Sequence, residues 1–111
     1  MHILDDRDLY GGLIRLHVLH HASETALYGH WMIEELRRHG YDTGPGTMYP
    51  LLHGLERKGY LRAKRERSGS RYRKVYRLTR DGERALTVAR RRVRELFGEM
   101  FEGTPRKRRK S

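Results

Sequence analysis

The pattern of hydrophobic and polar positions predicts two helices at the start of the chain. Apolar side chains occupy most faces of residues 5–21, which predicts a largely buried helix. In residues 26–39 the apolar side chains share one face, which predicts an amphipathic helix. Thr25 is a suitable N-cap for this second helix, and Gly40 is suited to end it.

A third, shorter helix is expected after the turn-forming residues 41–46. Its buried stripe is formed by Leu51, Leu52 and Leu55. Because proline is tolerated in the first turn of a helix, Pro50 predicts an N-cap at Gly46 or Thr47. A helix that began as early as Pro45 would be expected to kink at Pro50. Gly59 is expected to end the helix.

The second half of the chain predicts a hairpin and a long helix. Residues 60–67 and 72–79 read as antiparallel strands around a turn at residues 68–71. The strand residues expected to face the helices are Leu61, Ala63, Tyr72, Tyr76 and Leu78. The last helix runs from residue 80 to about residue 101, and its apolar residues follow steps of three and four, as in a coiled coil.

The order helix, helix, helix, hairpin, long helix defines the fold class. It predicts an α+β, mainly α fold: a winged helix-turn-helix with an added long C-terminal dimerisation helix. We divide the chain into a DNA-binding domain (residues 1–79), the dimerisation helix (residues 80–102) and a disordered basic tail (residues 103–111). The tail is open to three interpretations: a nuclear signal, a phosphate-binding arm, or an appendage without a role.

Composition narrows the class of partner. The 111 residues suit one domain, and the absence of cysteine excludes disulfides and thiolate zinc sites. No apolar run approaches the roughly 20 residues that span a bilayer, and no signal peptide is recognisable, so we expect a cytoplasmic protein. Residues 1–56 hold 4 Lys and Arg against 8 Asp and Glu, whereas residues 57–111 hold 21 against 6. This asymmetry favours a polyanion such as nucleic acid as the partner.

Several motifs together resemble the PadR family of bacterial transcriptional regulators. They are Tyr28-Gly29, Gly46-Thr47-Met48-Tyr49-Pro50-Leu51-Leu52, Leu55-Glu56, Gly59-Tyr60-Leu61, and Arg73-Lys74-Val75-Tyr76-Arg77-Leu78-Thr79 with Gly82. The resemblance covers roughly residues 9–101. It implies a homodimeric repressor that binds a palindromic operator in double-stranded DNA and leaves it when an effector binds. We expect such a bacterial protein to be associated with the nucleoid.

The third helix and the residues before it are the expected readers of DNA. The candidates are Thr43, Gly46, Thr47, Met48, Tyr49 and His53. Threonine and histidine can hydrogen-bond base edges, and a methionine or a threonine methyl can contact a thymine methyl. Tyr49 can donate to a phosphate. In the alternative interpretation, Met48 and Tyr49 pack inward and only fix the helix.

The hairpin supplies the expected phosphate contacts. The candidates are Lys64, Arg65, Arg67, Ser70, Arg71, Arg73 and Lys74, around Gly69. Cations at the tip of a wing gain from the phosphate charge and from the potential of the minor groove. The alternative is an ordinary charged hairpin in water.

Apolar residues of the first and last helices are expected to form a dimer interface. The candidates are Leu9, Leu13, Leu86, Ala89, Val93, Leu96, Phe97 and Met100. Two-fold symmetry would then place two recognition helices about one DNA turn apart, roughly 34 Å. The alternative is that the last helix packs on the first helix of its own chain, and both arrangements can coexist.

Two further groups of residues suggest ligands. Trp31 and Tyr28 form a second apolar face on the second helix, either an aromatic effector site or part of the dimer core. His17, His20 and His21 have the spacing of metal ligands, but three histidines on a buried helix more often serve packing. We therefore expect no cofactor.

No constellation of residues indicates an enzyme. The chain lacks a phosphate-binding Gly-Lys-Ser/Thr loop, and no carboxylate pair or Ser/His/Asp set is singled out by its spacing. The alternative function is a nonspecific winged-helix protein that binds DNA architecturally or binds structured RNA. Its support is the large positive charge and the basic tail.

Overall fold

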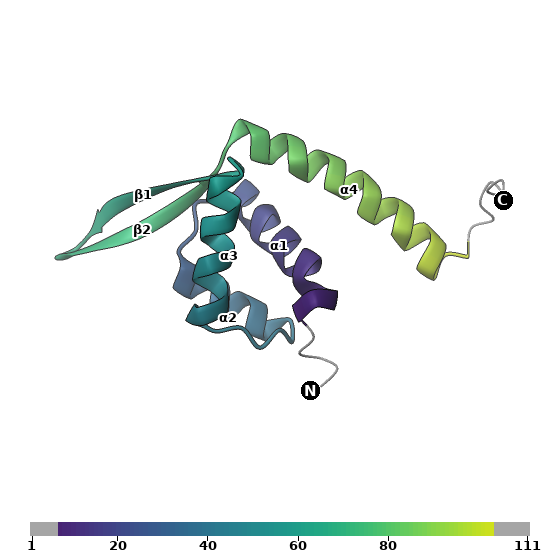
Figure 1. Ribbon diagram of the computed structural model, residues 1–111, viewed down its shortest axis with the longest axis horizontal. Helices are drawn as coiled ribbons and strands as arrows, with labels where there is room; N and C mark the ends of the chain where they lie inside the picture. Colours follow the sequence, from purple (N-terminus) through teal and green to yellow (C-terminus); the bar gives the residue numbers. More distant parts are fainter. Residues whose placement is uncertain (1–6, 104–111) are drawn as a thin grey trace.

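The computed structural model describes residues 7–103, which form three packed helices, a hairpin and a long last helix (Figure 1). The elements in chain order are α1 (Arg7–Glu24), α2 (Gly29–Arg38), α3 (Pro45–Arg57), β1 (Leu61–Ser68), β2 (Arg71–Leu78) and α4 (Arg80–Phe101). The hairpin and α4 project from the three-helix body in opposite directions (Figure 1). The predicted winged helix-turn-helix with a long C-terminal helix is confirmed, while most of the predicted basic tail, residues 104–111, lies outside the described residues.

One hydrophobic core joins the three helices to the base of the hairpin. Its most completely buried side chains are Val18, Leu27, Met32, Leu36, Met48, Leu52, Leu61 and Tyr76. Burial of one such side chain contributes about 1.5–3 kcal/mol to folding. Because α3 and the hairpin share this core, their relative position is fixed by packing.

The approach to α2 differs from the prediction. Leu27 and Tyr76 exchange two backbone hydrogen bonds of 2.9 Å, so the chain before α2 lies extended along the free edge of β2. Since an extended residue cannot lie in a helix, α2 begins at Gly29, and the prediction that Thr25 is the N-cap is wrong. Tyr28 holds the N-cap position without a side-chain hydrogen bond. The first helix is also longer than predicted at its C-terminal end, reaching Glu24.

The start of α3 is the second correction. Gly44 is the N-cap and Pro45 follows it in the first turn, where a missing N–H is tolerated, so the N-cap predicted at Gly46 or Thr47 is wrong. Pro50 therefore lies inside the helix and cannot donate to the carbonyl of Gly46. Gly46 is an exposed residue, and the helix continues to Arg57.

The end of α3 follows the prediction. Gly59 has φ +85°, a conformation that strongly favours glycine. The amide of Gly59 donates to the carbonyl of Glu56 and that of Tyr60 to the carbonyl of Leu55, at 2.9 and 3.0 Å. These bonds satisfy carbonyls that the last turn leaves open and direct the chain into β1.

The hairpin is closed by a two-residue turn, and a polar cap begins α4. Ser68 pairs with Arg71, and Gly69, with φ +66°, lies in the turn between them. At the base of the hairpin, the Thr79 hydroxyl oxygen accepts from the amide of Gly82 (2.9 Å) and donates to the carbonyl of Gly59 (2.5 Å). This one side chain therefore connects the end of α3 to the start of α4.

Candidate nucleic-acid interface

The exposed face of α3 is opposite its buried stripe. The buried residues are Met48, Leu51, Leu52 and Leu55. Four exposed residues share the other side of the helix at spacings of three and four, namely Gly46, Pro50, His53 and Arg57, and Pro45 in the first turn is also exposed. This face carries an imidazole and a guanidinium, both suited to donate hydrogen bonds to base edges or phosphates.

Two predicted DNA contacts are contradicted by their burial. The side chain of Met48 has no exposed surface and belongs to the core, so the prediction that it touches a base is wrong. Thr43 is only 4% exposed, and its hydroxyl oxygen is buried, so this side chain is not available to DNA either. The alternative interpretation, inward packing, therefore holds for Met48.

Tyr49 and Thr47 are neither fully buried nor fully exposed. Tyr49 is half-buried and packs at the edge of the core, with its ring against Gly29 at the start of α2. Thr47 is half-buried beside the N-terminal half of α1. Arg57 was not among the sequence candidates, although it follows His53 by four residues and so shares its face.

The hairpin concentrates positive charge. Residues 61–78 hold eight Lys and Arg and one acidic residue, Glu66. Glu66 accepts two hydrogen bonds from the guanidinium of Arg77, which lowers the pKa of the Glu66 carboxyl and raises that of Arg77. Seven other basic residues therefore dominate the electrostatic potential of the wing.

Strand pairing divides these cations between two faces. Arg65, Arg67 and Lys74 lie on one face of the hairpin. At the base of the hairpin, Leu61 and Tyr76 of the same face pack on α3. The cations of the opposite face are Arg62, Lys64, Arg71, Arg73 and Arg77. All the predicted wing residues are exposed, namely Lys64, Arg65, Arg67, Ser70, Arg71, Arg73 and Lys74.

Tyr72 organises the tip of the wing. It is 56% exposed, so the prediction that it faces the helices is wrong; the hairpin extends beyond them. The guanidinium groups of Arg65 and Arg67 lie 5.1 and 5.5 Å from the centre of its ring. Arg67 also donates from Nε to the carbonyl of Gly69 at 3.1 Å. Cation–π contacts of this kind hold two arginines near the turn in place.

The two residues predicted to form an effector site have different neighbours. The guanidinium of Arg73 lies 4.9 Å from the ring centre of Tyr28, so Tyr28 supports the wing. The ring of Trp31 meets His21 of α1 edge-to-face at 5.4 Å. Trp31 is 41% exposed and therefore accessible to a ligand.

Of the eight predicted dimerisation residues, most are exposed. The exposed members are Leu9, Leu13, Val93, Leu96, Phe97 and Met100, and Ala89 is half-buried. Leu86 differs, because it belongs to the core of its own chain and needs no partner to be buried. A hollow of about 630 Å³ lies between α1 and α4, and its lining includes Leu16, Val93 and Phe97.

A cluster of rings joins α1 to the end of α2. The ring of His17 lies 5.1 Å from that of His39 and 5.4 Å from that of Tyr41. Burial lowers the pKa of His17, and the neighbouring His39 and His21 lower it further. His17 thus has the packing role that the sequence left open, whereas His20 and His21 lie beside the carboxylate of Glu24.

The fold and the surface together define a winged helix-turn-helix protein with a basic wing. The model of the transcriptional regulator PadR-like family matches residues 18–88. The transcriptional regulator Rv3488 of Mycobacterium tuberculosis is 44% identical over 97 residues, which cover 87% of this chain and 91% of that protein. The chain belongs to the PadR-like family of transcriptional regulators.

Solved structures agree with this assignment. A PadR family transcriptional regulator from Eggerthella lenta is similar with a TM-score of 0.73 and 30% identity, covering 86% of this chain and 84% of that one. A Streptococcus transcriptional regulator is similar with a TM-score of 0.75 and 31% identity, covering 86% and 94%. The protein is therefore a transcriptional regulator and not an enzyme. Among residues 7–103, none of the helices has both the length and the apolar composition needed to cross a bilayer.

Proposed function

We propose that this protein is a dimeric repressor that binds a palindromic operator in duplex DNA. The observation that carries the proposal is the joint placement of α3 and the wing. The exposed face of α3 presents His53 and Arg57, and the hairpin face that packs on α3 presents Arg65, Arg67 and Lys74. A helix of groove size beside a cationic ribbon suits base readout and phosphate contact together.

In this proposal, α3 enters the major groove through its exposed face. His53 and Arg57 contact base edges or phosphates. The first turn of α3, at Gly46 and Thr47, approaches the sugar–phosphate backbone of the DNA. The wing lies along the neighbouring phosphates or in the minor groove, where Arg71 near the tip gains from the negative potential.

Dimerisation is supported by the exposed apolar seam of α4. Val93, Leu96, Phe97 and Met100 are each about half or more exposed, and Leu9 and Leu13 extend the apolar surface onto α1. An exposed apolar surface of this kind marks a protein interface. We infer that α4 of a second copy fills the hollow between α1 and α4, which would place two α3 helices roughly 34 Å apart.

Release by an effector is the part of the proposal that rests on the family resemblance. Trp31 is the one tryptophan of the chain, and its indole is accessible. Titration with planar cationic or phenolic compounds should quench or shift its fluorescence and weaken DNA binding in parallel. Unchanged fluorescence with every compound that releases DNA would place the effector elsewhere.

Selection of binding sites from a random duplex library tests the central proposal. We expect a palindrome whose half-sites are about 10 base pairs apart, bound roughly 10³-fold or more tightly than random duplex at physiological salt. A library that yields no enriched motif, with affinity governed by salt alone, would instead support the nonspecific architectural protein.

A further inference from the structure

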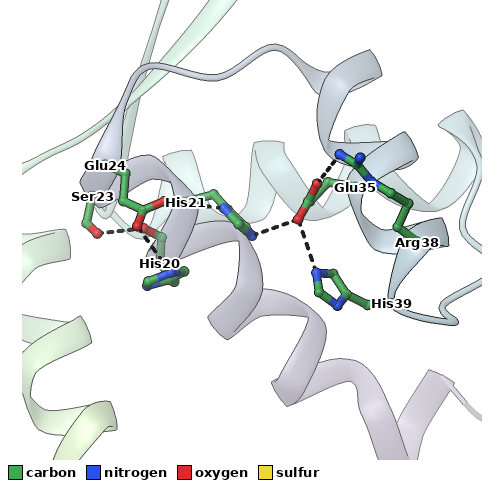
Figure 2. Close-up of polar contacts among 7 residues, drawn as sticks. All are labelled: His20, His21, Ser23, Glu24, Glu35, Arg38 and His39. Carbon is green, nitrogen blue, oxygen red and sulfur yellow. Dashed lines mark hydrogen bonds and ion pairs between the residues drawn. The ribbon is translucent and has the colours of Figure 1, made fainter.

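Two imidazoles and a carboxylate converge at the C-terminal end of α1 (Figure 2). Nε2 of His20 lies 3.6 Å from one oxygen of Glu24, and Nδ1 of His21 lies 3.7 Å from the other. The three candidate ligand atoms all lie within 4.8 Å of one another. A single carboxylate therefore stands between two imidazole nitrogens.

These distances do not suit hydrogen bonds. An N–H···O bond has a heavy-atom distance of about 2.7–3.2 Å, and both contacts are longer. Ligands of a tetrahedral zinc ion lie about 3.3 Å apart, given bonds of about 2.0–2.1 Å to nitrogen and oxygen. The two histidine–carboxylate separations exceed this value by a few tenths of an ångström. The three ligand atoms, which lie within 4.8 Å of one another, need to draw together by at most about 1.5 Å to hold a metal ion.

A second carboxylate orients the His21 ring from its other side. Nε2 of His21 lies 3.6 Å from Glu35 of α2, whose carboxylate is itself held by Arg38 at 2.7 Å and His39 at 3.1 Å (Figure 2). The side chains of His21 and Glu35 are only 16% and 13% exposed. The negative charge of Glu35 favours the tautomer that carries the proton on Nε2, in which the lone pair of Nδ1 is directed at Glu24. Metal-binding histidines commonly have this kind of partner.

We propose that His20, His21 and Glu24 bind one divalent transition-metal ion of the zinc class, with Glu35 positioning His21. Two imidazoles and one carboxylate are a zinc ligand set, and the exposure of Glu24 leaves room for water as a further ligand. His17 is not part of the site, because its ring packs on His39 and Tyr41. Through His21 and Glu35, the ion would connect α1 to α2.

The chain contains a matched reference for this site. His30 and Glu34 on α2 form the same i, i+4 pair as His20 and Glu24, with the same 3.6 Å separation. The His30 side chain is 82% exposed, and the pair has neither a third ligand among the described residues nor an orienting carboxylate. Nonspecific zinc binding by surface histidines would occur at both His–Glu pairs. Zinc binding by a preorganised site would occur only at the pair on α1.

Calorimetric titration of the purified full chain with zinc chloride, in a buffer that does not bind zinc, tests the proposal. We expect one ion per chain, a loss of at least about 10-fold in affinity for His21→Gln, and about 10- to 100-fold for Glu35→Gln. Glu24→Gln removes an exposed ligand without disturbing the core and should weaken binding comparably. Trp31 fluorescence should change on zinc addition, because its ring touches His21.

His30→Gln is the control and should bind zinc like the wild type. The absence of binding by the wild type would overturn the proposal. So would unchanged affinity in both His21→Gln and Glu24→Gln, or an equal loss in His30→Gln. The readout is metal binding alone, so the result does not depend on whether DNA is bound.

Discussion

The ring of Tyr49 lies against the backbone of Gly29. A Cβ atom at Gly29 would come within 2.5 Å of Cε1 and 2.9 Å of the hydroxyl oxygen of Tyr49. Gly29 begins α2 and Tyr49 lies in the first half of α3, so this contact sets how closely the two helices of the helix-turn-helix approach each other. It also directs Tyr49 toward the core rather than into solvent.

Gly29→Ala should therefore destabilise the protein. The added methyl displaces a ring wedged between two helices, and overpacking of this kind costs about 1–3 kcal/mol. Urea denaturation at fixed protein concentration measures the change. Gly12→Ala is the matched control: Gly12 is also helical, a Cβ there meets nothing within 4 Å, and alanine should stabilise α1 slightly.

The same contact predicts strong coupling between the two positions. In a Tyr49→Ala background the ring is gone, so Gly29→Ala should cost almost nothing. Additive effects in the double variant would show that the strain arises elsewhere.

Local sequence rules predict much of this fold. The stripe of Leu51, Leu52 and Leu55 and the stop at Gly59 follow from spacing and from backbone preference, and both are confirmed. The burial of Met48 follows from the same rule, since it precedes Leu51 by three residues and Leu52 by four. For Met48, helical spacing therefore predicts the position of the side chain better than the ability of methionine to contact a thymine methyl does.

Other features depend on contacts between distant segments. The extended backbone at Leu27 exists because β2 offers a free edge at Tyr76, 49 positions later. The start of α2 therefore cannot be deduced from a good N-cap residue such as Thr25. The exposure of Tyr72 likewise depends on how far the hairpin extends past the helices. The orientation of His21 by Glu35 also needs the packing of α1 on α2.

Thr79→Ala should cost about 1–2 kcal/mol of stability. The hydroxyl group caps α4 by accepting from Gly82 and also donates to the carbonyl of Gly59, so two elements lose a partner. Thermal unfolding followed by circular dichroism measures the loss. Thr87→Ala is the control, because its hydroxyl only donates back to Glu83 on the exposed surface of α4. An equal effect at both positions would contradict a special role for the cap.

Tyr76→Phe should be neutral or slightly stabilising. The hydroxyl oxygen of Tyr76 is buried and has no hydrogen-bond partner among the described residues, and burial raises the pKa of this group. Removing an unsatisfied polar atom relieves a desolvation cost of about 1–3 kcal/mol, partly offset by lost contacts. Chemical denaturation of both proteins tests this. A loss above about 1 kcal/mol would show that the hydroxyl is satisfied in solution.

Arg71→Ala should weaken binding to every duplex alike and lower the slope of log K against log salt by about one unit. Arg71 is exposed beside the hairpin turn, where a guanidinium can reach phosphates without reading bases. Fluorescence anisotropy at several salt concentrations measures the slope. Arg91→Ala removes the same charge from α4 and should leave the slope unchanged. If the two variants show the same salt slope, the wing does not contact the DNA backbone.

Phe97→Glu should convert the protein to a monomer and abolish high-affinity binding to a two-half-site operator. Phe97 lines the hollow between α1 and α4 and is 49% exposed, so a carboxylate there would lie unpaired in the proposed apolar interface. Light scattering after size exclusion measures the mass. Val88→Glu is the matched control: Val88 is 46% exposed on the same helix but lies nine residues away, on the opposite side. Since Val88→Glu adds the same charge outside the seam, it should remain dimeric and bind the operator. A dimeric Phe97→Glu variant would move the interface away from the seam of α4.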